Sequence, residues 1–156
     1  PGISSVSYLA ALTGYSYQDA AVLSIHGHGA DSEWIGNLTE TIRFSAKTFL
    51  LMSGKEDVQK LGRLLQNYHL QNCTVLAGFQ LSYPQEKVLT LTPEACEHVE
   101  ETGLYICLIL NPDAEKKAVT CGIQDEQFLR DKVPMTKGDK SVVYLQIAFK
   151  RGFRLL

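Results

Sequence analysis

The chain has 156 residues, of which 45% are hydrophobic and 21% charged, and its formal charge at pH 7 is -2. A chain of this length can bury about 70% of its unfolded surface as one domain and is too short for two ordinary domains. The near-neutral charge excludes a strongly basic binder of nucleic acid or membrane surfaces, and no apolar run approaches the roughly 20 residues of a membrane span. Because no secretory signal is visible either, we expect a cytoplasmic protein.

The first half of the chain alternates between helical and extended patterns. Apolar residues at helical spacing after a serine cap predict a helix at Val6–Thr13 that stops at Gly14. A short strand is predicted at Ala20–Gly27, and a second apolar stripe predicts a helix at Glu33–Phe44. The run KTFLLMSG, residues 47–54, is continuously apolar and is closed by glycine, which is typical of a strand covered on both faces.

The second half continues this alternation. An amphipathic helix is predicted at 56–68, strands at 73–78 and 88–92 around the turn LSYPQEK, and a last strand at 103–110. Thr92 before Pro93 predicts a capped helix at Pro93–Val99. The whole pattern predicts an α/β sandwich with a mixed, mainly parallel sheet and helices on both faces.

Four cysteines are widely and irregularly spaced: Cys73, Cys96, Cys107 and Cys121. They form no C-x-x-C pair and no Cys/His spacing of a zinc module. We therefore expect reduced thiols, mostly in the core.

The loop HGHG contains the most suggestive polar residues of the chain. His26 and His28 would project to the same side of an extended segment, and the following turn and helix start resemble a generic anion-binding arrangement. A metal site would need a third ligand, and none lies nearby in the sequence, so a role at the sheet edge is favoured. One hypothesis is a non-catalytic α/β module that binds an anion or a metal through HGHG.

The sequence encodes no catalytic triad, P-loop or paired-carboxylate site. If the protein is an enzyme, its catalysis should rest on holding a reactive cofactor against a substrate, which leaves little motif behind.

The C-terminal half of the tetrapyrrole methylase family resembles this chain in four segments that occur in order: PGISSVSYLAALTGYSYQDAAVLSIHGH, LLMSGKED, LQNCTVLAGFQLSYPQEKV and GLYICLILNP. The likeness covers Pro1 to Pro112 and is strongest to the precorrin-6Y methyltransferase subgroup, which often has a Pro-Gly-Ile-Ser-Ser start, a Ser-x-His-Gly segment and a Leu-Ser/Gly-Tyr-Pro turn. It implies an S-adenosylmethionine-dependent C-methyltransferase that methylates a corrin precursor in cobalamin biosynthesis. Because family members commonly pair, it also leaves room for a homodimer.

The resemblance assigns particular residues to the cofactor and substrate sites. The positions that match cofactor-binding segments are Ser4, Ser5, Ser53, Leu81, Leu104 and Tyr105. His26 and His28 would face the substrate, and no residue is identified as catalytic. The structural alternatives for the cofactor positions are a helix cap, a turn, an apolar plug and buried strand residues. The chain departs from the family at Phe79 and Gln80, where Glu and Asn are common, and at His28, where Arg is common.

The segment DEQFLRDKVPMTK, Asp125–Lys137, resembles the start of a decarboxylating methyltransferase domain that follows the methylase in fused enzymes of the same pathway. We therefore expect a methylase C-terminal domain at 1–120, whose N-terminal half is missing, and a linker with the start of a second domain at 121–137. Codons for Gly138–Phe149, shifted by one nucleotide, can encode the expected continuation, so 138–156 is interpreted as a frameshifted tail. The alternative is a divergent native strand. Because half of a cleft offers few contacts, we expect the isolated chain to be inactive and to bind the cofactor weakly or not at all.

Overall fold

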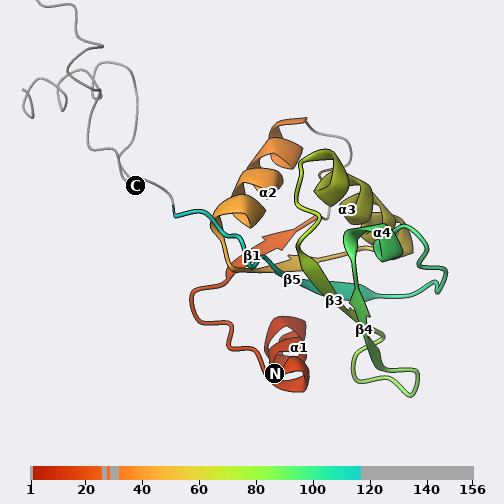
Figure 1. Cartoon of the computed structure of the whole chain (residues 1–156). Coiled ribbons are helices and arrows are strands. Elements are labelled where there is room, and N and C mark those ends of the chain that lie inside the picture. The colour runs from red at the N-terminus through yellow and green to blue at the C-terminus, as the bar shows by residue number, and fades with distance from the viewer. Residues whose placement is uncertain (1, 26–27, 29–31, 117–156) are drawn as a thin grey trace, which may run out of the picture. The chain divides into compact units, whose positions relative to one another are not determined.

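The computed structural model describes residues 2–25, 28 and 32–116. A five-stranded sheet in the order β1-β2-β5-β3-β4 carries helices on both faces (Figure 1). The elements in chain order are α1 (Ser5–Thr13), β1 (Ala21–Ser24), α2 (Ser32–Phe44), β2 (Lys47–Leu51), α3 (Lys55–Asn67), β3 (Thr74–Phe79), β4 (Lys87–Leu91), α4 (Pro93–Cys96) and β5 (Tyr105–Leu110). The predicted α/β class and the helices on both faces are confirmed.

Local signals in the sequence fix several of these ends. The Ser4 hydroxyl accepts a hydrogen bond from the Val6 N–H at 3.3 Å and so caps α1. Gly14 ends that helix with φ of 74°, a left-handed conformation that glycine adopts without steric cost. At α4, the Thr92 hydroxyl accepts from the Ala95 N–H at 3.2 Å. Each cap satisfies an N–H group that the first turn of a helix would otherwise leave without a partner.

The prediction of a mainly parallel sheet is wrong. Only β1 and β2 pair in parallel, whereas β2 with β5, β3 with β5, and β3 with β4 pair in antiparallel fashion. The strands β1, β2 and β3, which helices connect, do run in one direction, but β5 inserts between β2 and β3 and runs the other way. A continuous apolar run indicates burial on both faces and carries no information about the direction of the neighbouring strands.

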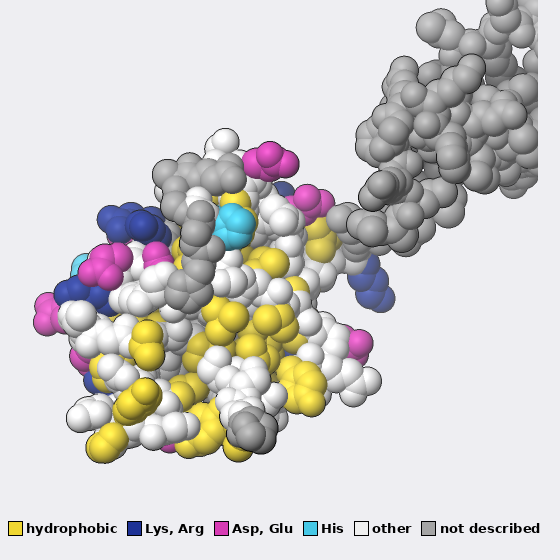
Figure 2. Space-filling view, turned by 180° about the vertical axis from the view of Figure 1, so that it is seen from behind, with side chains coloured by type: hydrophobic (Ala, Val, Ile, Leu, Met, Phe, Trp, Pro, Cys, Tyr) yellow, Lys and Arg dark blue, Asp and Glu magenta, His cyan; other side chains and the backbone are white. Residues whose placement is uncertain are grey.

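Two hydrophobic clusters hold the layers together. The larger lies on the side of α2, α3 and α4 and includes Ile42, Leu50 and Leu61. The smaller lies beneath α1, where Leu9 packs with Phe49 and Leu108. Alternate residues of β2 and β5 enter opposite clusters, as the period of a strand requires. Figure 2 shows apolar side chains exposed on one face of the molecule. In the described part of the chain, the large exposed apolar residues include Tyr83 and Leu104.

Two predicted elements end earlier than expected. β1 stops at Ser24, although the Ile25 N–H still donates to the Leu51 carbonyl at 3.0 Å. α4 stops at Cys96 because the next N–H groups, including that of Val99, bond to carbonyls three residues back, as in a tightening final turn. Within the described part of the chain, no helix combines the length and apolar character that crossing a membrane requires.

Several expectations lie outside the described residues. They concern His26, the Gly27 end of the predicted strand, Cys121, and the proposed boundaries at 120 and 137 with the tail that follows. The other three cysteines are free and buried, as predicted.

Candidate functional site

A cavity of about 210 Å³ opens at one edge of the sheet. It forms where β2 and β3 end and β5, which runs between them in the opposite direction, begins. The pairing of Leu51 with Ile106 and of Phe79 with Tyr105 brings these ends together. The residues that line it are Ser5, Leu51, Met52, Gly78, Leu81, Tyr83, Leu104, Tyr105 and Ile106. Loops and strand ends from distant parts of the chain thus meet at one place.

Four of the six predicted cofactor residues line this cavity. Ser5 is the first residue of α1, and Leu81 lies in the loop after β3. Leu104 comes directly before β5 and is 59% exposed, and Tyr105 is the first residue of that strand. These residues come from three places far apart in the sequence, so their meeting is a property of the tertiary fold.

The side chain of Tyr105 points away from the cavity. Its ring belongs to the larger cluster, 5.0 Å from the ring of Phe79, and its hydroxyl donates to the Glu101 carbonyl at 3.1 Å. Burial, followed by the nearby charge of Glu101, raises the pKa of Tyr105 to about 12. We infer that Tyr105 borders the cavity through its main chain and that its phenol stabilises the segment before β5.

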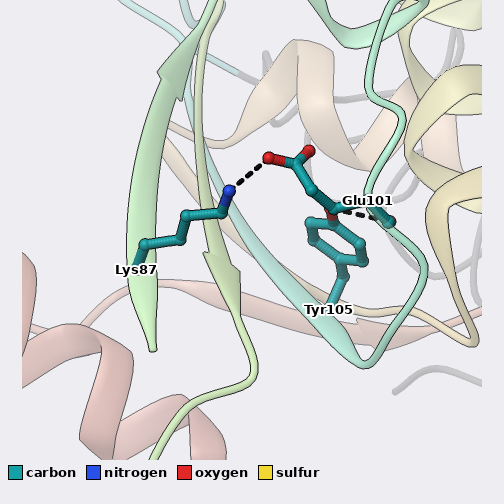
Figure 3. A network of polar contacts seen from close by, with 3 residues as sticks. All are labelled: Lys87, Glu101 and Tyr105. Atoms are coloured by element: carbon teal, nitrogen blue, oxygen red, sulfur yellow. Dashed lines mark hydrogen bonds and ion pairs between the residues drawn. The ribbon is translucent and has the colours of Figure 1, made fainter. Parts of the chain in front are cut away.

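A polar network holds that segment in place (Figure 3). The Lys87 ammonium from β4 pairs with the Glu101 carboxylate, and it also lies 5.3 Å from the centre of the Phe79 ring. The hydrogen bond that the Lys87 ammonium donates to the Glu101 carboxylate is the main cause of the lowered pKa of Glu101. Both side chains are partly exposed, so the pair orients the chain before Leu104 more than it stabilises the fold.

The loop after β3 adopts an unusual backbone conformation beside the cavity. Gln80 and Ser82 have φ angles of 47° and 68°, in the left-handed region that residues with a side chain seldom occupy. The Gln80 N–H donates to the Leu104 carbonyl at 3.0 Å, and the Ser82 N–H donates to the Glu86 carboxylate at 2.6 Å. These bonds fix the loop that carries Leu81. Phe79 and Gln80, the departures from the family pattern, do not line the cavity.

Sequence reasoning missed five of the lining residues: Leu51, Met52, Gly78, Tyr83 and Ile106. Gly78 lies inside β3, where an added Cβ would come within 3.0 Å of Leu9 and 3.1 Å of Leu81. The signal that could have revealed it is glycine inside a strand, which often marks close approach of a ligand or of another chain segment. No comparable signal marks Met52 or Tyr83, which reach the cavity only through the fold.

Ser4 and Ser53 do not line the cavity. Ser4 is occupied as the cap of α1, and the Ser53 N–H donates to the Asp57 carboxylate at 2.8 Å. Asp57 is 9% exposed and lies in the first turn of α3, where a negative charge interacts favourably with the helix dipole. Ser53 nevertheless follows Met52, which lines the cavity, so it lies at the same sheet edge.

His28 is exposed and stacks on Trp34, with ring centroids 5.1 Å apart. It does not line the cavity at the sheet edge. Within the described residues, no three His, Cys, Asp or Glu side chains are grouped as a metal site would require. The substrate-binding prediction for His26 concerns a residue outside the described part, and that for His28 stays a prediction.

Two solved structures share this arrangement of elements. One is a cobalamin biosynthetic enzyme, cobalt precorrin-4 methyltransferase, with a TM-score of 0.54, 16% identity, and coverage of 70% of this chain and 49% of the other. The second is described as a diphthine synthase from Entamoeba histolytica, with a TM-score of 0.53, 12% identity, and coverage of 72% and 53%. Both have the tetrapyrrole methylase fold. This chain has about half of that fold.

The chain spans about half the length of the solved structures that it matches. No protein-family model matches it, and no curated protein matches it. At 16% and 12% identity the likeness establishes the fold alone. Function must therefore be inferred from the cavity at the sheet edge and not from the fold.

Proposed function

We propose that the chain is part of an S-adenosylmethionine-dependent methyltransferase that methylates a corrin precursor in cobalamin biosynthesis. One observation carries the proposal: Ser5, Leu81, Leu104 and Tyr105, which the family resemblance assigns to the cofactor site, surround a single cavity. The fold shared with a cobalt precorrin-4 methyltransferase supports the same reaction class.

The residues around the cavity suit the uncharged adenosine part of this cofactor. None of the described residues that line it is charged, and Gly78 lets the Leu9 and Leu81 side chains lie close to β3. Leu81 and Tyr83 offer apolar surface for a flat heterocycle, while strand ends offer main-chain hydrogen-bonding groups. When bound, S-adenosylmethionine supplies an electrophilic methyl group.

The chain's own contribution to catalysis is orientation. An electron-rich macrocycle is itself the nucleophile, so the protein needs to hold two reactants in line and exclude water and does not need a triad. The fixed loop around Leu81 and the segment anchored by Lys87 and Glu101 serve that purpose. The exposed Leu104 and Tyr83, at 59% and 56%, are surface that a facing domain would cover.

Finer specificity follows from the resemblance. We propose that the substrate is a precorrin-6Y or the related cobalt-precorrin, methylated at carbon 5, and that a fused or partner decarboxylating methyltransferase domain works on the same intermediate. The Asp125–Lys137 segment supports this choice over other methylases of the pathway. A homodimer belongs to the same proposal.

A titration with S-adenosylhomocysteine, followed by NMR of the labelled chain, tests the cofactor site. We expect weak binding in the millimolar range, with amide shifts concentrated at Ser5, Gly78 and Leu104, because half of a cleft provides few contacts. Micromolar affinity by isothermal titration would contradict the half-cleft argument. Shifts that are concentrated away from the cavity would overturn the proposed site.

A matched pair of glycine variants sharpens this test. Gly78→Ala places a methyl group 3.0 Å from the end of the Leu9 side chain and 3.1 Å from that of Leu81, so Leu81 has to shift and binding should weaken while the fold persists. Gly36→Ala places the same methyl group in open space on α2 and should leave binding unchanged. Equal affinities for the two variants would exclude the cavity as the binding site.

A further inference from the structure

A second, larger cavity of about 560 Å³ lies between α2 and α3. The two helices cover the same face of the sheet (Figure 1), but α2 packs on β2 while α3 packs on α4 and β5. The volume falls within the range of small-molecule sites, about 300–1,000 Å³. This cavity shares no lining residue with the one at the sheet edge.

The interior of this cavity is apolar. Leu38, Leu50 and Leu61 form its floor and are buried, with 2%, 0% and 2% exposure. Trp34 and Leu64 line it as well and remain half-buried, so the apolar wall continues from the core toward solvent. An apolar group that entered would be removed from water on several sides.

Among the described residues, the polar ones that line the cavity come from α3 and the residue that follows it: Lys60, Arg63, Asn67 and Tyr68. Two of them are cations, and none of the described residues that line the cavity is acidic. The Lys60 ammonium forms an ion pair with the Asp57 carboxylate, with 3.8 Å between nitrogen and oxygen. Arg63 has no ion-pair partner among the described residues. Both cations are exposed, so a charge beside them stays partly hydrated and avoids the cost of full burial.

We propose that the cavity between α2 and α3 binds a small amphipathic monoanion, with an unbranched apolar chain against Leu38, Leu61 and Leu64 and a carboxylate at Arg63. The apolar floor favours the hydrocarbon chain of the ligand, and the positive charges of Lys60 and Arg63 favour a negatively charged head group. This site is independent of the methyltransferase proposal.

The fluorescence of Trp34 reports ligand binding in the cavity, because Trp34 is the only tryptophan of the chain and lines the cavity. The 156-residue chain is titrated with decanoate, octanoate, decanol and decyltrimethylammonium, each below its micelle concentration, while Trp34 fluorescence is followed. We expect saturable binding of decanoate, about fifteenfold tighter than octanoate, because decanoate has two more methylenes and each buried methylene contributes roughly a fourfold gain. Decyltrimethylammonium should bind more weakly than decanoate.

Charge variants on α3 separate the head-group contact from nonspecific attraction. Arg63→Gln should weaken decanoate by about threefold and leave decanol unchanged, since an exposed ion pair contributes little more than that. Lys55→Gln is the control, because Lys55 lies on the same helix, bonds to the Glu100 carbonyl and does not line the cavity.

Three results would overturn the proposal. The first is no saturable change in Trp34 emission, and the second is equal affinity for decanoate and decyltrimethylammonium. The third is an equal effect of Arg63→Gln and Lys55→Gln, which would show an apolar cavity with no anion selectivity.

Discussion

Helices α3 and α4 approach each other closely at Gly62. Comparing Gly62→Ala with Gly36→Ala separates the packing cost of an added methyl group from its effect on helix propensity. A Cβ at Gly62 would lie 2.5 Å from the Pro93 carbonyl oxygen and 2.8 Å from the Cys96 Cβ, whereas one at Gly36 meets nothing within 4 Å. Replacing glycine by alanine inside a helix is favourable by about 1 kcal/mol in either case. Overpacking at Gly62 costs about 1–3 kcal/mol in addition, because a main-chain oxygen cannot rotate away.

The free energy of unfolding should therefore rise by up to about 1 kcal/mol in Gly36→Ala and be lower in Gly62→Ala by about 1–3 kcal/mol relative to that variant. Since the propensity gain is shared, the difference between the two variants isolates the packing cost. Urea unfolding followed by far-UV circular dichroism measures both, and equal m-values confirm that the comparison is valid. If Gly62→Ala is as stable as Gly36→Ala, α3 and α4 do not pack as described.

Three further predictions concern buried and paired polar groups. Thr48 is fully buried and its hydroxyl has no hydrogen-bond partner among the described residues, so Thr48→Val should stabilise the chain by about 1 kcal/mol in urea unfolding. Thr39→Val, which loses hydrogen bonds to two carbonyls, should not stabilise it. Burial raises the pKa of Cys73 to about 11 and of Cys96 to about 12, from 9.0. Because the folded pKa values lie above the unfolded one, the stability that these thiols contribute is complete below pH 9 and is lost as pH rises toward 12. Urea unfolding at a series of pH values should show this decline, and a flat profile from pH 9 to 11 would refute it. Glu101→Gln breaks an exposed ion pair and should cost less than about 1 kcal/mol, with an effect that shrinks in high salt; a loss of several kcal/mol in the same assay would contradict that ranking.

Much of the secondary structure could be predicted because its signals are local. The serine cap of α1, the left-handed Gly14 and the Thr92-Pro93 start of α4 each act within a few residues. The burial of β2 on both faces also followed from its continuous apolar run. Where prediction failed, as at the end of α4, the competing turn hydrogen bonds leave no distinctive sequence signal.

The candidate site was only partly predictable. The family resemblance pointed to Ser5, Leu81 and Leu104, which meet at the cavity, and also to Ser4 and Ser53, which lie outside it. A motif match cannot tell whether a residue faces a cavity or caps a helix, because both roles use the same residue types. The distinction requires the direction in which each side chain leaves the backbone.

The sequence by itself determined the kind and approximate limits of the helices and strands, the burial of the central strands and the reduced, buried state of Cys73, Cys96 and Cys107. These properties follow from hydrophobic period, capping and burial preference, all of which act over short distances along the chain. The tertiary structure alone decided the insertion of β5 between β2 and β3, and with it both the antiparallel pairing and the cavity at the sheet edge. It also decided the gap between α2 and α3. These features depend on contacts between segments distant in sequence, whose order is set by packing of the whole domain and is not encoded in any one segment.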